Sequence, residues 1–165
     1  SMLKDFGCQY VLVGHSERRQ NQGETNAIVA QKAKRAQAVG LIPVVCVGEP
    51  SHIRASGDAV LYVRDQVLSS CEDLTGDLVI AYEPVWAIGS GEAASADVAS
   101  EMHLEIKAVL ADRYPELRVL YGGSVKPDNC AAFTMATGID GLLVGGASLS
   151  AESFWSICAS AKGAE

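Results

Sequence analysis

The sequence predicts an α/β fold in which parallel strands alternate with helices, and two observations carry this prediction. Five short runs are continuously apolar, which is typical of strands that are covered on both faces. Between these runs lie longer segments whose apolar residues recur at helical spacing. Repeated strand–helix units indicate a parallel sheet, either open and doubly wound or closed into a barrel.

The predicted elements alternate along the whole chain. The helix expected at residues 25–39 should end at Gly40. The helix expected at residues 127–135 should begin at Pro127, because proline suits the first turn of a helix. Pro43 fits the first residues of a strand, because it has no N–H group to donate. The expected strands are residues 10–13, 41–47, 78–82, 117–121 and 141–144. The expected helices are residues 25–39, 58–70, 95–113, 127–135 and 150–161.

Composition narrows the class of protein. The 165 residues suit one domain spanning residues 1–165, and 48% hydrophobic residues can fill a sizeable core. A net charge of −7 disfavours nucleic acid as a partner. The apolar runs are too short to cross a bilayer, and no secretory signal is evident, so we expect a cytoplasmic location. The five cysteines have no CxxC spacing, which predicts reduced, mostly buried thiols and neither disulfides nor a metal site.

Polar residues and glycines follow the predicted strands, and the carboxyl ends of parallel strands meet at the edge where ligands bind. Two glycine pairs, residues 122–123 and 145–146, follow the last two strands. Glycines let backbone N–H groups approach an anion closely, and two such loops in succession match a common phosphate site of barrels. The alternative interpretation is two ordinary tight turns.

Glu83 and His15 are the candidates for acid–base chemistry. A carboxylate directly after a buried strand is costly unless it faces a polar cavity or a partner, and partial burial raises the pKa of a carboxyl group and makes it a better base. The alternative for Glu83 is a buried ion pair with Arg18 or Arg19. His15 lies where a helix begins, which favours a neutral imidazole that can donate a hydrogen bond; the alternative is a structural histidine.

Two further segments surround these candidates. Glu17 and the arginines beside it are expected to form a salt-bridged support for the loop after the first strand. Pro84 keeps Glu83 extended, and residues 84–86 are stiff and bulky, whereas residues 89–91 are small. This pattern predicts a lid that closes over a ligand.

Four motifs, "VGHSERR", "AYEPVWAIGSG", "YGGSV" and "GLLVGGASL", occur in this order and resemble triosephosphate isomerase. The combination of the first two separates the chain from other phosphate-binding barrel enzymes. The resemblance implies a partial TIM (β/α)8 barrel, with five parallel strands each followed by a helix. It also implies interconversion of dihydroxyacetone phosphate and glyceraldehyde 3-phosphate through an enediolate, in glycolysis and gluconeogenesis, without a cofactor or a metal.

The resemblance also implies residue roles. Glu83 matches the base that moves the proton, and His15 matches the neutral electrophile that polarises the carbonyl group. Glu17 and Cys46 match residues that support the site. The positions that match the phosphate grip are Gly89, Ser124, Gly145 and Gly146.

The sequence departs from the family pattern in two ways. Glu92 stands where the family has a lysine at the rear of the lid. The sequence also has no counterpart to the family's first three units, whose first strand carries an asparagine and a catalytic lysine; Lys126 is a cation that could approach the phosphate instead. We therefore expect weak or lost activity and a homo-oligomer in which a second copy covers the open edge or face. The alternative is a non-catalytic, self-associating partial barrel that still binds phosphate.

Overall fold

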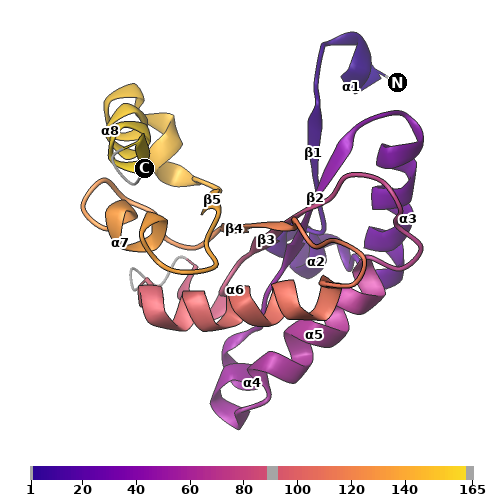
Figure 1. Cartoon of the computed structure of the whole chain (residues 1–165), viewed down its shortest axis with the longest axis horizontal. Helices are drawn as coiled ribbons and strands as arrows, with labels where there is room; N and C mark the ends of the chain where they lie inside the picture. Colours follow the sequence, from indigo (N-terminus) through magenta and orange to yellow (C-terminus); the bar gives the residue numbers. More distant parts are fainter. Residues whose placement is uncertain (1, 89–92, 163–165) are drawn as a thin grey trace.

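The computed structural model describes residues 2–88 and 93–162, and its centre is a single parallel sheet. The strand order is β1-β2-β3-β4-β5, and every neighbouring pair is parallel. Within the described part of the chain the sheet is open, with β1 and β5 as its edges (Figure 1). The predicted parallel α/β fold is confirmed. The strands are β1 (Tyr10–Val13), β2 (Ile42–Val47), β3 (Val79–Tyr82), β4 (Arg118–Tyr121) and β5 (Gly141–Leu142).

Each strand is followed by one or two helical segments, and a short helix precedes the first strand. Figure 1 shows α7 and α8 beyond one edge of the sheet and α1 beyond the other. The segments before β2 are α1 (Met2–Asp5), α2 (Ser16–Gln22) and α3 (Asn26–Ala38). Those between β2 and β4 are α4 (Ser51–Ser56), α5 (Ala59–Ser70), η1 (Val85–Ala87) and α6 (Ala96–Leu110). The last are α7 (Cys130–Thr134), η2 (Gly146–Leu149) and α8 (Ala151–Lys162).

Local chemistry sets the helix boundaries. Thr25 and Ser95 precede α3 and α6, and each hydroxyl accepts a hydrogen bond from an N–H three residues later, which caps the helix. The prediction that α6 runs to residue 113 is wrong, since the chain turns after Leu110. The predicted start of α7 is also wrong, because the side chain of Asn129 bonds the Lys126 N–H in a turn that precedes the helix.

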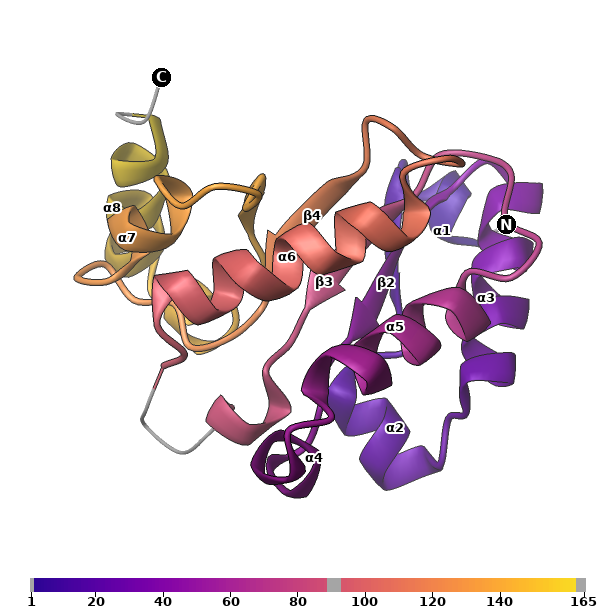
Figure 2. The ribbon, with the colours of Figure 1, turned by 60° about the horizontal axis from the view of Figure 1, so that its bottom comes forward.

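The larger core lies between the sheet and the helices on one of its faces. Helices α3, α5 and α6 pack in sequence across that face (Figure 2), and buried aliphatic residues such as Val45, Ile80 and Ile106 fill the space between. The opposite face of the sheet carries a smaller cluster around Val44 and Val79. This asymmetry places most of the apolar stabilisation on the helical side.

The prediction that every strand is covered on both faces is wrong for β1. Its inner face, which is the face turned away from α3, α5 and α6, is partly exposed. Tyr10 is 45% exposed and Leu12 is 46% exposed, because no strand or helix of the described residues lies over them. The five cysteines are unpaired in the structure, and three of them, Cys46, Cys71 and Cys130, are buried, in agreement with the expected burial. No helix in the described ranges has both the length and the apolar character needed to cross a membrane.

Candidate active site

A cavity of about 1070 Å³ opens at the carboxyl edge of the sheet. Cys46 is not among the residues that line it, and Gly89 and Glu92 lie outside the described residues. The structure brings six of the predicted site residues together around this cavity: His15, Glu17, Glu83, Ser124, Gly145 and Gly146.

His15 is held at the start of α2 by its own ring. Gly14, with φ of 71°, turns the chain out of β1 in a left-handed conformation that favours glycine. The Nδ1 atom of His15 then accepts a hydrogen bond from the Glu17 N–H at 3.3 Å. A ring nitrogen that accepts carries no proton, so a neutral imidazole here has its proton on Nε2. Nε2 lies 3.1 Å from Oε1 of Glu83, which places that N–H against the carboxylate.

Glu83 is 2% exposed, although it sits at the mouth of the sheet. Its Oε2 atom accepts a hydrogen bond from the Ser16 N–H at 2.9 Å. Burial raises the pKa of the Glu83 carboxyl, while the Ser16 N–H and the His15 ring oppose the rise. The result is a carboxylate that is poised to take up a proton and has a donor on each oxygen.

The arginines beside His15 do not pair with Glu83, so that alternative is wrong. Arg18 forms an ion pair with the buried carboxylate of Glu24, which also contacts Lys32. Arg19 donates from Nε to the Gly14 carbonyl at 2.7 Å and from a terminal nitrogen to the Cys46 carbonyl at 3.1 Å. Arg19 therefore ties the loop after β1 to β2, through backbone carbonyls instead of a salt bridge to Glu17.

Cys46 lies on β2, opposite Ala81 in the parallel register, and is fully buried. Burial raises the pKa of its thiol well above the usual range, and the negative charge of Glu83 adds to the rise. A neutral thiol therefore packs beneath the carboxylate. This position fits the supporting role expected of Cys46.

The predicted hinge is anchored by a residue that sequence reasoning passed over. Glu49 is fully buried at the end of β2, and its Oε1 accepts hydrogen bonds from Trp86 Nε1 at 2.8 Å and Tyr82 Oη at 3.1 Å. Arg54 of α4 lies 3.3 Å from the same oxygen. The available signal was an acid separated by one residue from the end of a buried strand, which is close to the signal that identified Glu83.

The two glycine pairs differ in what surrounds them. A Cβ on Gly123 would lie 2.3 Å from Tyr121 Oη, and one on Gly122 would lie 3.0 Å from Glu83 Cγ. The first pair is therefore required by close packing around the ends of β3 and β4. A Cβ on Gly145 or Gly146 would meet nothing within 4 Å, so the second pair is open to the cavity and to a ligand.

The loop after β4 is clamped by Asn129, which sequence reasoning also missed. Its Nδ2 donates to the Ser124 carbonyl at 2.9 Å, and its Oδ1 accepts from the Lys126 N–H at 2.7 Å. The Ser124 hydroxyl donates to the Ala87 carbonyl at 3.3 Å. These bonds join the phosphate-loop candidate to η1, the segment that begins the predicted lid.

Comparison with known proteins finds similar sequences along nearly the whole chain. The model of the triosephosphate isomerase family matches residues 1–161. Triosephosphate isomerase of Thermus thermophilus is 51% identical over 162 residues, which is 93% of this chain and 65% of that protein. The Polynucleobacter asymbioticus enzyme of the same name is 51% identical over 165 residues, 96% of this chain and 66% of that protein. The chain thus spans about two thirds of the length of these curated relatives.

Proposed function

The chain belongs to the triosephosphate isomerase family, and from this premise we propose that its site carries out the proton transfer that interconverts dihydroxyacetone phosphate and glyceraldehyde 3-phosphate. The single observation that supports the proposal best is the 3.1 Å contact between His15 Nε2 and the buried Glu83 carboxylate. An acid–base pair of this kind, next to open glycine loops, suits a carbon acid that carries a phosphate group. A cytoplasmic location and a glycolytic role belong to the same proposal.

Each group has a defined task in this proposal. The Glu83 carboxylate removes a proton from the carbon next to the substrate carbonyl, and the electron pair of the broken C–H bond becomes the enediolate. The Nε2–H of His15 donates a hydrogen bond to the oxygen that gains negative charge. A proton also passes from the neighbouring hydroxyl oxygen to the oxygen that gained the charge. Glu83, now protonated, returns its own proton to the adjacent carbon, so the atoms balance and the reaction is an isomerisation that needs no cofactor. Glu17 supports this step through the backbone N–H that it donates to His15.

The phosphate group is assigned to the opposite part of the cavity. Gly145 and Gly146 are exposed there with open space around them, and Ser124 lies on the neighbouring loop. Gly89 completes the grip in this proposal, as the family motif implies. The phosphate would be held by backbone N–H groups, which provide orientation but little net charge.

We expect the 165 residues alone to turn over slowly or undetectably. They contain no counterpart to the family's first-strand lysine, and an electrostatic group of that type is worth about a hundredfold or more in rate. A coupled isomerase assay with Glu83→Gln as the matched variant tests the assignment. Activity that disappears with the substitution supports it, and activity that survives belongs to a contaminant and counts against it.

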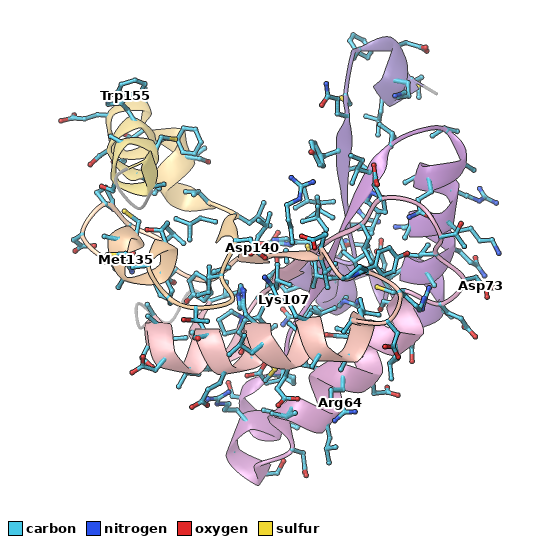
Figure 3. All side chains as sticks on the ribbon, in the orientation of Figure 1. Arg64, Asp73, Lys107, Met135, Asp140 and Trp155 are labelled. Atoms are coloured by element: carbon cyan, nitrogen blue, oxygen red, sulfur yellow. The ribbon has the colours of Figure 1, made fainter. Side chains whose placement is uncertain are left out.

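The alternative function is a non-catalytic module that associates with a second copy. The observation that favours it is the pair of apolar edges: Leu12 of β1 is half exposed, and at the other edge Leu149 is 91% exposed and Trp155 74% exposed. Figure 3 shows Trp155 on α8, at the periphery of the molecule. A sedimentation measurement that finds only monomers at micromolar concentration would remove this alternative.

A further inference from the structure

We propose that Lys126 is the charged anchor for the phosphate group, an inference that rests on the proposed function. Among the described residues that line the cavity, Lys126 supplies the one lysine or arginine side chain. Three carboxylates, those of Glu17, Glu83 and Asp128, line the same cavity. A dianionic phosphate therefore meets an excess of negative charge unless Lys126 is close.

The charge of the whole chain makes this local cation more important. The net charge of −7 gives a surrounding potential that repels a dianion, and the walls of a cleft strengthen the effect of the charges that line it. Backbone N–H groups of glycine loops orient a phosphate but do not cancel its charge. A nearby ammonium reverses the sign of the local field and contributes charge-assisted hydrogen bonds.

The backbone of Lys126 is fixed in the loop that the phosphate would contact. Its N–H donates to Asn129 Oδ1 at 2.7 Å, and its carbonyl accepts from the N–H groups of Asn129 and Cys130 at 3.2 and 3.0 Å. Lys126 is two residues beyond Ser124, whose carbonyl the same Asn129 side chain holds. A fixed backbone with a flexible four-carbon side chain lets the ammonium reach a ligand without moving the loop.

The ammonium of Lys126 is also uncommitted. In the described ranges no salt bridge involves Lys126, whereas Lys32 and Lys107 are paired with Glu24 and Asp140. Figure 3 shows Lys107 and Asp140 near one another, and neither of them lines the cavity. An exposed, unpaired lysine at the rim of a cavity with three carboxylates can bind an anion without first breaking an ion pair.

The test is titration of the 165-residue protein with inorganic phosphate by calorimetry at low ionic strength. Lys126→Met is expected to weaken phosphate binding about tenfold, because it removes one unit of opposite charge at short range. Lys126→Arg should retain most of the affinity, since the charge is kept. The difference between wild type and Lys126→Met should shrink as salt is added.

Lys34→Met is the matched control. Lys34 lies on the exposed side of α3, where it contacts Asp73 and not the cavity, so the substitution changes net charge equally without touching the site. One outcome overturns the anchor assignment but supports the phosphate loops. In that outcome, Lys126→Met and Lys34→Met bind phosphate as tightly as wild type does, whereas Gly146→Ala binds it more weakly. If wild type binds no phosphate at millimolar concentration, both the phosphate loops and the anchor are overturned.

Discussion

At the scale of single residues, Gly123 and Gly146 should respond differently to the same substitution. Gly123→Ala is expected to lower the free energy of unfolding by about 1–3 kcal/mol, because its Cβ would lie 2.3 Å from Tyr121 Oη. Gly146→Ala meets no protein atom within 4 Å, so stability should be nearly unchanged while phosphate binding weakens. Urea unfolding and phosphate titration separate the two effects. Equal loss of stability in both variants would contradict the assigned difference.

The titration of Glu83 should change how the free energy of unfolding depends on pH. Burial raises its pKa, so the folded protein holds this proton to higher pH than the unfolded chain does. Between the ordinary glutamate pKa, about 4.3, and the raised folded value, wild type therefore loses stability relative to Glu83→Gln as pH rises. At neutral pH the variant should be the more stable protein, and below the ordinary pKa the two should converge.

Urea unfolding of both proteins from acidic to neutral pH measures this difference directly. The titration of His103 changes stability in the opposite direction. Burial lowers the pKa of His103 to about 4, so its contribution to the free energy of unfolding falls as the pH drops below the ordinary histidine pKa. Because His103 is present in both proteins, its contribution cancels in the comparison. A difference that stays constant with pH would show that Glu83 does not titrate as its burial requires.

The positions of Glu83 and His15 at the cavity could be predicted because each depends on its immediate neighbours in the chain: a buried strand before the acid, a helix start after the histidine. Their mutual contact follows from the meeting of parallel strand ends. The bond from Glu49 to Trp86 could not be predicted, since it joins side chains 37 residues apart whose rotamers depend on packing. The Asn129 clamp was missed for a different reason, because that residue was assigned to a helix.

At the scale of elements, Glu49 joins the end of β2 to β3, α4 and η1. Glu49→Ala would leave Trp86, Tyr82 and Arg54 without their common acceptor. We expect a loss of about 3 kcal/mol in the free energy of unfolding, together with a red-shifted Trp86 emission as η1 loosens. Fluorescence on a Trp155→Phe background isolates the Trp86 signal.

Glu101→Ala is the matched control for this substitution, because Glu101 is an exposed glutamate on the outer side of α6. It should change stability by only a few tenths of a kcal/mol. An unchanged Trp86 spectrum in Glu49→Ala would mean that η1 is held by its backbone alone.

The sheet was predictable from apolar runs and the short helices were not. The predicted residues 10–13 agree with β1, and the next three strands each begin one residue later than expected, because a continuous apolar run marks a strand wherever it lies. Helices α4 and η1 are too short for a helical period to appear in the sequence. Each contacts Glu49 through one side chain, Arg54 of α4 and Trp86 of η1.

At the scale of the whole molecule, the open inner face of β1 predicts self-association. Leu12→Lys should shift the protein toward monomer, because it places a charge on a half-exposed apolar surface that a second copy would cover. Leu61→Lys on α5 is the control, since Leu61 is 67% exposed on the outer helical side. Sedimentation velocity at several concentrations measures the mass. Equal behaviour of both variants and wild type would place any interface elsewhere.

The strand order β1-β2-β3-β4-β5 has a kinetic consequence. Every strand pairs with the one that precedes it in the chain, so each new strand released from a ribosome finds its partner already in place. Pairing then proceeds in the order of synthesis, and each step closes a loop of only one or two helical segments and their connections. Closing such a sheet into a ring is the one step that joins strands far apart in the chain. That step carries the largest entropic cost of loop closure, and pairing among the five described strands proceeds without it.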